Sequence, residues 1–208
     1  MLLKWISGQV LPSKRHIFAQ AQDNWIQLKY VPGFRWQLAG WSESDETVFG
    51  VLAGWDSLEL YSEFMTNIHD QIAAPQSGLF KTKTYLLANV ECLIGQEIEL
   101  REASTTGYLR VADCRVSARD IENFWTAQRE VWNPGMVATR GMQGGVAGTA
   151  IDDPARCVIA TTWQSQADHE LYLRDAFSEL KLKANNESHL ESVSGSRILL
   201  DQRWHLSK

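Results

Sequence analysis

Cysteine is scarce in this sequence, with only three residues in 208. They stand at Cys92, Cys114 and Cys157, far apart and without a Cys-x-x-Cys pair. An odd, scattered set does not form a disulfide framework, so we expect free thiols and a reducing, cytoplasmic setting. The five histidines show no His-x-x-x-His spacing. We therefore expect no metal site.

Long apolar runs and clusters of basic residues are absent too. No stretch approaches the ~20 apolar residues that span a bilayer. The start of the chain, MLLKWISG, lacks the charged region and long apolar core of a signal peptide. The net charge is −5, and no concentrated basic face offers a site for phosphate backbones. We expect neither a membrane nor a nucleic acid among the partners.

Motifs for phosphate-bearing cofactors and for serine nucleophiles are missing as well. The glycines between 141 and 148 form neither a Gly-x-x-x-x-Gly-Lys loop nor a Gly-x-Gly-x-x-Gly turn. No Gly-x-Ser-x-Gly elbow is present. We therefore expect no resident cofactor.

What the sequence does contain is a pattern that occurs twice. Each half has a helical stretch ending near a tryptophan, a Pro-Gly pair, two strand-like runs ending at Trp55 or Trp163, and a second helical stretch. A period of about a hundred residues indicates a duplicated domain, because solenoid repeats have roughly 20–50 residues. Pro134-Gly135 lies farther before Trp163 than Pro32-Gly33 lies before Trp55. We expect the extra residues at the tip of the second hairpin, around 151–154.

The periodicities within each half predict the ferredoxin-like order β-α-β-β-α-β. Helices on one face of a four-stranded sheet leave the other face bare, and burial of apolar area contributes roughly 25 cal/mol per Å². We therefore expect an α+β fold in which two tandem ferredoxin-like units pack their sheets together as an intramolecular dimeric α+β barrel. The first unit is placed at 1–92, the connection at 93–106 and the second unit at 107–208.

Two segments carry a resemblance to a known superfamily. VLAGWDS (51–57) and IATTWQS (159–165) are hydrophobic strands that end in tryptophan before a helix. This arrangement resembles the dimeric α+β barrel superfamily, which includes the antibiotic-biosynthesis-monooxygenase-like proteins. The first half looks like the uncharacterised YdbC-like branch in residues 3–6, 32–34, 40–41, 64–65, 69–70 and 76–78.

The resemblance implies a cavity between sheet and helices, lined by aromatic residues. It also implies a range of activities, from oxygenases without metal or flavin to haem-degrading enzymes. Haem-degrading members have an axial histidine after the second helix of each unit, and the run 175–180, DAFSEL, has none. We expect no haem.

His69 is the candidate catalytic residue. The superfamily resemblance implies a histidine near this point that faces the cavity, where it could act as a base or orient a substrate. The alternative is a structural histidine hydrogen-bonded to a neighbouring strand. Phe177 stands at the matching position of the second half. A histidine-dependent site is therefore expected in the first half only.

Four further residues are candidates for substrate binding: Trp36, Trp41, Tyr61 and Asn24. The two tryptophans are five positions apart on the first hairpin and face opposite sides of a regular strand. Core packing is the alternative for the aromatic residues, and ordinary helix surface is the alternative for Asn24.

The sequence favours a small-molecule-binding protein of the monooxygenase-like barrel type, with a small hydrophobic or aromatic molecule as partner. One alternative is a cofactor-independent monooxygenase that acts on a small aromatic or polyketide-like substrate, with His69 as the base. A second alternative is a structural or interaction protein with no working pocket. A monomeric pseudo-dimer and a homodimer are both compatible with the sequence.

Overall fold

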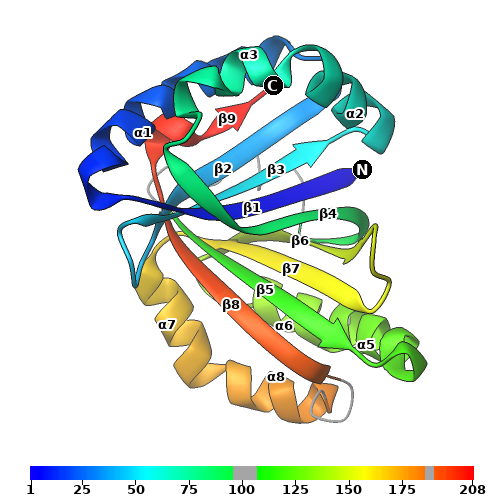
Figure 1. Cartoon of the computed structure of the whole chain (residues 1–208). Helices are drawn as coiled ribbons and strands as arrows, with labels where there is room; N and C mark the ends of the chain where they lie inside the picture. The colour runs from blue at the N-terminus through cyan, green and yellow to red at the C-terminus, as the bar shows by residue number, and fades with distance from the viewer. Residues whose placement is uncertain (96–106, 186–189) are drawn as a thin grey trace. The chain divides into compact units, whose positions relative to one another are not determined.

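The computed structural model describes residues 1–95, 107–185 and 190–208 (Figure 1). They form two compact units: unit 1 contains residues 1–87 and 198–208, and unit 2 contains residues 88–197. The division falls within two strands, β4 and β8, so each unit contains a part of both. The predicted connection, 93–106, lies largely outside the described residues. The predicted boundaries of the two repeated ferredoxin-like units, 1–92 and 107–208, stay a prediction.

Unit 1 consists of an antiparallel sheet with helical segments along it. Its strands are β1 (Leu2–Val10), β2 (Phe34–Ser42), β3 (Val48–Trp55), the first part of β4 (Phe80–Ile94), β9 (Leu206–Ser207) and the end of β8. Its helical segments are η1 (Pro12–Lys14), α1 (Arg15–Ala21), η2 (Gln22–Tyr30), α2 (Leu58–Asn67), α3 (His69–Ala73), η3 (Ala74–Gln76) and η7 (Gln202–Trp204). The strand order is β4-β1-β3-β2, with β9 and the end of β8 beside β2. Figure 1 shows α1, α2 and α3 together on one side of this sheet.

Unit 2 repeats this plan. Its strands are the second part of β4, β5 (Tyr108–Val116), β6 (Met142–Ala150), β7 (Arg156–Trp163) and the first part of β8 (Leu190–Leu200). Its helical segments are η4 (Ala118–Asp120), α5 (Ile121–Ala127), the π-helix η5 (Gln128–Trp132), α6 (Asn133–Val137), α7 (Gln166–Asp175) and α8 (Phe177–Ala184). The strand order is β4-β6-β7-β5-β8. The predicted α+β class and its strand-helix order are confirmed.

The tryptophan that ends the third strand organises the core of each unit. Trp55 and Trp163 are 1% and 0% exposed. The ring of Trp55 lies 4.9 Å from that of Phe64 at 31°, and the ring of Trp163 lies 4.9 Å from that of Tyr172 at the same angle. The helix that follows each tryptophan begins at a serine whose Oγ accepts a backbone N–H three residues later. The local packing is thus repeated in detail.

The prediction that the second half has its extra residues at the tip of its hairpin is wrong. Pro134 and Gly135 do not form the turn before β6, because both lie inside α6. Proline is well tolerated at the start of a helix, and a Cβ at Gly135 would lie 2.3 Å from Leu180. The counterpart of Gly33 is Gly141, since both have a positive φ, of 77° and 81°. As many residues separate Gly141 from Trp163 as separate Gly33 from Trp55, so the extra residues precede Gly141.

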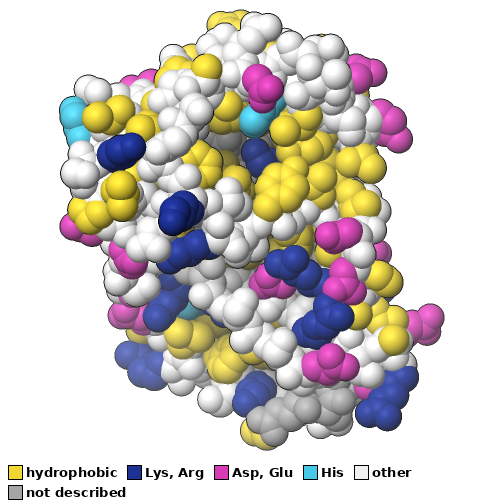
Figure 2. All heavy atoms as spheres, in the orientation of Figure 1, with side chains coloured by type: hydrophobic (Ala, Val, Ile, Leu, Met, Phe, Trp, Pro, Cys, Tyr) yellow, Lys and Arg dark blue, Asp and Glu magenta, His cyan; other side chains and the backbone are white. Residues whose placement is uncertain are grey.

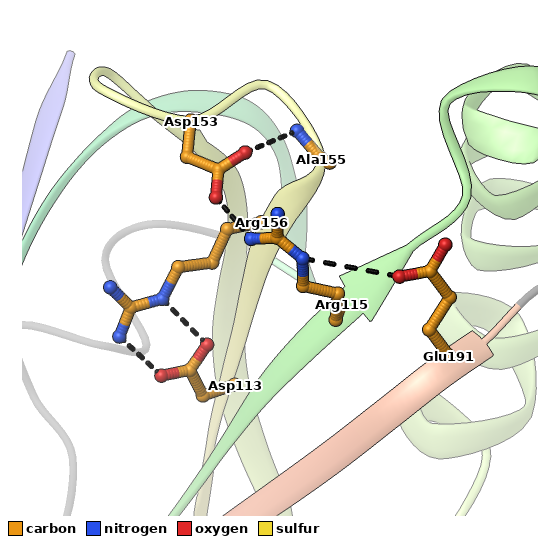
Figure 3. Close-up of polar contacts among 6 residues, drawn as sticks. All are labelled: Asp113, Arg115, Asp153, Ala155, Arg156 and Glu191. Atoms are coloured by element: carbon orange, nitrogen blue, oxygen red, sulfur yellow. Dashed lines mark hydrogen bonds and ion pairs between the residues drawn. The ribbon is translucent and has the colours of Figure 1, made fainter.

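A polar network joins the strand ends of unit 2 (Figure 3). The guanidinium of Arg156 on β7 donates to both carboxylate oxygens of Asp113 on β5, at 2.9 and 2.5 Å. Arg115 donates to Asp153 and forms an ion pair with Glu191 at 4.0 Å. On the face drawn in Figure 2, basic side chains lie beside acidic ones. Such pairs fix neighbouring strands in register at a partly hydrated surface.

Candidate functional site

Unit 1 contains a cavity of about 560 Å³ between its sheet and its helical segments. Lys4 and Gln37 reach it from the sheet, and Trp25, His69 and Gln76 reach it from the helical side. Ligand pockets usually have volumes of about 300–1,000 Å³. The face of the molecule drawn in Figure 2 has a hollow in which a histidine and a basic side chain lie among hydrophobic side chains. Both the size and the mixed lining suit a small organic molecule.

Lys4 is a cation on an otherwise apolar strand face. Lys4 lies two positions from both Leu2 and Ile6 along β1, so the pleat of the strand directs all three side chains to the same face of the sheet. Its Nζ lies 5.7 Å from the centre of the Trp25 ring, a distance at which a cation is attracted to an indole face. Among the described residues, Lys4 has no carboxylate or hydrogen-bond partner. Burial lowers the pKa of Lys4 to about 8.

Trp25 and Gln76 meet through a buried hydrogen bond in which Trp25 Nε1 donates to Gln76 Oε1 at 2.9 Å. An indole N–H can only donate, so it fixes the glutamine amide with its oxygen toward Trp25. Gln76 Nε2 is consequently left without a partner among the described residues, although the side chain is only 5% exposed. A buried N–H without an acceptor is unfavourable. This donor and Lys4 line the same cavity.

His69 is the first residue of α3, which begins where α2 ends at a break in the helical geometry of Ile68. Its imidazole lies 5.7 Å from the rings of both Trp25 and Phe64. The Nδ1 atom lies 2.9 Å from Asp70 Oδ1, so this nitrogen is engaged and Nε2 is the one left to contact a ligand. The His69 side chain is 23% exposed and the Asp70 side chain 98%. A ligand can therefore reach the imidazole.

The other four predicted residues do not line this cavity. Trp36 is 0% exposed, and its indole lies so close to Gly54 that a Cβ there would be 2.6 Å away. Trp41 packs with Phe18 and Trp204. The Tyr61 hydroxyl pairs with that of Tyr85 at 2.6 Å. Asn24 is half-buried on η2. A role for these four in binding stays a prediction.

Lys4 and Gln76 were missed although both lie in stretches that resemble the YdbC-like branch, 3–6 and 76–78, because that resemblance assigns no role to either residue. Alternation along β1 was the available signal, since a lysine between Leu2 and Ile6 on one face of a predicted strand is exceptional. Gln76 had no such signal. Its partner Trp25 is 51 positions away in the sequence.

Unit 2 has a cavity of its own, of about 540 Å³. Arg110 occupies in β5 the place that Lys4 occupies in β1, because Tyr108 faces Trp163 as Leu2 faces Trp55. Phe177, the counterpart of His69, lines this cavity, and so does His169 on α7. A histidine is therefore available in both units, at different positions.

Comparisons with known proteins agree with this fold. Residues 2–91 match a family described as a domain of unknown function (DUF4937). A stretch of 74 residues is 35% identical to the uncharacterised protein YdbC of Bacillus subtilis (strain 168) and covers 35% of this chain. The chain spans 62% of the length of that relative. No helix among the described residues is long and apolar enough to cross a membrane.

Three solved structures share the architecture over nearly the whole chain. A candidate monooxygenase from Lactobacillus acidophilus NCFM has a TM-score of 0.74 at 13% identity, covering 100% of this chain and 99% of its own. One from Fusobacterium nucleatum has 0.75 at 11% identity, with 100% and 94% covered. An anthrone oxidase-like protein has 0.67 at 13% identity, with 96% and 91% covered. The predicted resemblance to the dimeric α+β barrel proteins of the monooxygenase-like type, and to YdbC, is confirmed.

Proposed function

We propose that this chain is a small-molecule-binding protein and that the cavity of unit 1 binds a small aromatic molecule with an anionic or hydrogen-bond-accepting oxygen. The observation that carries the proposal is the presence of two donors, Lys4 Nζ and Gln76 Nε2, that line the cavity without an acceptor among the described residues. A ligand oxygen that accepts from them removes the penalty of leaving them unpaired. The indole of Trp25 provides a flat wall for a ring.

The structural neighbours support an aromatic ligand. Two of them are described as candidate monooxygenases and a third as anthrone oxidase-like. The fold alone is a weak argument for a substrate, because one fold hosts many activities. Here it agrees with the chemistry of the cavity lining.

The test is a thermal-shift and fluorescence titration with dihydroxyanthraquinone, a flat ring system that carries acceptor oxygens. Ligand binding to the native state raises the melting temperature by an amount set by RT ln(1 + [L]/Kd). We expect Lys4→Met to weaken binding at least tenfold, and the matched control Lys81→Met, an exposed lysine on β4, to leave it unchanged. Equal binding by wild type and a folded Lys4→Met protein would contradict the proposal.

A cofactor-independent monooxygenase is the second candidate, and the observation in its favour is His69 in the same cavity as Lys4. The imidazole would take a proton from an acidic C–H or O–H of the substrate, and the Lys4 ammonium would stabilise the resulting anion while it reacts with O₂. With anthrone the balance is simple, because one O₂ converts it to anthraquinone and one water.

Oxygen consumption with anthrone, measured above the uncatalysed background, tests this candidate. His69→Phe copies the residue of unit 2 and is expected to abolish the enzymatic rate. His16→Ala removes an exposed histidine outside the cavity and is expected to keep it. Binding of the aromatic ligand without oxygen consumption would favour a binding protein over an enzyme. If neither binding nor oxygen consumption is found, a structural or interaction role remains.

A further inference from the structure

The cavity of unit 2 has a lining unlike that of unit 1. Its walls are mainly aromatic and aliphatic, with Phe124, Trp132 and Met136 from one group of helices and Tyr172 and Phe177 from the other. Such walls suit an apolar ring or chain. The volume of about 540 Å³ is in the usual range for small-molecule sites.

Arg110 brings a guanidinium into this apolar setting. One of its N–H groups donates to the backbone oxygen of Val111. A Cβ at Gly195 on β8 would lie 2.6 Å from Arg110 Nη2, so the guanidinium rests directly against the backbone of a glycine. Among the described residues, Arg110 has no carboxylate partner. A partly buried cation without a counter-ion is costly, and a structure does not retain it for stability alone.

The rest of the lining is also suited to an anion. Lys181 and Arg197 line the cavity, and among its described lining residues there is no aspartate or glutamate. Trp132 Nε1 is buried and has no acceptor in the described part of the chain. An anion with an acceptor oxygen would satisfy the guanidinium and offer the indole N–H a partner.

We propose that the cavity of unit 2 binds the carboxylate of a small amphipathic molecule, with Arg110 as the anchoring cation and the aromatic walls around the apolar body. The planar guanidinium matches a carboxylate with two parallel N–H···O bonds. A carboxylate can pair both of its oxygens with the Arg110 guanidinium in a lining whose other side chains are mostly apolar. A phosphate, with more charge and more acceptors, would leave acceptors unpaired against these walls.

The chemistry of this site is binding. Cys114 lines the cavity, but burial raises the pKa of its thiol to about 12, so it stays protonated and is a poor nucleophile. Burial also raises the pKa of Tyr172, which therefore stays neutral. Arg110 is accordingly the group that recognises the ligand.

The experiment is a fluorescence titration of the full chain with pyrenebutyrate and with pyrenebutanol, which has the same ring system and no charge. Wild type is expected to bind the carboxylate at least tenfold more tightly than the alcohol. Arg110→Met is expected to remove this preference, whereas Arg119→Met, at an exposed position on η4 outside the cavity, is expected to keep it. Decanoate should displace the probe, and inorganic phosphate at the same concentration should not.

A second variant guards against a folding defect in Arg110→Met. Gly195→Ala keeps Arg110 but forces its guanidinium aside, and is expected to weaken pyrenebutyrate binding with an unchanged melting temperature of the free protein. Equal affinity for the acid and the alcohol, or full binding by a folded Arg110→Met protein, would overturn the proposal. Displacement by inorganic phosphate would overturn the choice of a carboxylate. Loss of the preference in Lys4→Met alone would assign the probe to unit 1.

Discussion

Lys4 and Arg110 stand at the same register position in the first strand of their units, and the surroundings of the two cations differ. The cavity of unit 1 offers polar groups that include Gln76 and His69, whereas the cavity of unit 2 surrounds its cation with aromatic and aliphatic walls. The position of the charge is thus the same in both units, and the group that carries it is an ammonium in one and a guanidinium in the other. If both proposals hold, the two units bind an anion through matching cations and differ in the rest of the ligand that they accept.

The largest expected effect tests whether the two units are equivalent in their cores. Trp55→Ala and Trp163→Ala should each lower the free energy of unfolding by about 3–5 kcal/mol, because each removes a fully buried indole. Urea titrations measure both. Tyr30→Ala, at an 86% exposed position, is the control and should change stability by less than about 0.5 kcal/mol. If one of the two substitutions lowers the free energy of unfolding by less than about 1 kcal/mol, the two tryptophans are not equivalent in the cores of their units.

The second prediction is that ligand binding depends on pH in the cavity of Lys4 and does not in the cavity of Arg110. The pKa of Lys4 is lowered to about 8 by burial, so Lys4 loses its charge as the pH rises above that value. The affinity of unit 1 for anthraquinone sulfonate, which is ionised throughout, should then fall about tenfold per pH unit. Burial lowers the pKa of Arg110 as well, but a guanidinium stays charged in this range. Pyrenebutyrate binding by unit 2 should therefore be constant from about pH 7 to 10.

His69 and Asp70 also line the cavity of unit 1, so the titration needs a control. His69→Phe removes the imidazole, and the fall in affinity above pH 8 should persist in this variant if Lys4 is its source. Calorimetric titrations across the pH range measure the dissociation constants. A profile that flattens in His69→Phe would assign the pH dependence to the histidine and contradict the role given to Lys4.

The third prediction concerns the turn glycines that define the true register of the repeat. Gly33→Ala and Gly141→Ala should each cost about 1–3 kcal/mol, because both have a positive φ and a Cβ would clash with Leu60 or Asp168. Gly78 also has a positive φ, of 68°, but no atom lies within 4 Å of its Cβ position. Gly78→Ala is thus a control for strain without a clash, and its cost should be the smallest of the three. Equal costs would show that the clashes relax.

The fold was largely predictable because its signals are local. Periodic apolar residues mark the helices, and Trp55 and Trp163 mark the ends of matching strands before serine N-caps. Pro134-Gly135 misled because the pair has the same local signature as Pro32-Gly33. In the structure Gly135 lies inside α6 and directly against Leu180, a contact that no neighbouring residue reveals.

The site was less predictable because its groups come from separate elements. His69 could be named from a resemblance. Gln76 could not, because its importance depends on a hydrogen bond to Trp25 that fixes which end of the amide faces the cavity. Lys4 and Arg110 become informative only when the register of β1 and β5 shows that they are counterparts. Recognising a site of this kind requires contacts between distant parts of the chain.

The smallest expected effect concerns a feature of unit 2 that unit 1 lacks. The Arg156–Asp113 pair joins β7 to β5 with side chains that are 26% and 21% exposed, and the matching positions of unit 1 hold Val48 and Ser7. We expect the cycle of Arg156→Val, Asp113→Ser and the double variant to give a coupling of about 0.5–1 kcal/mol in urea unfolding. The coupling energy should be smaller at about 1 M salt, because the Debye length is then only about 3 Å and the two charges are screened from each other. A coupling near zero at low salt would mean that unit 2 gains no stability from its ion pair.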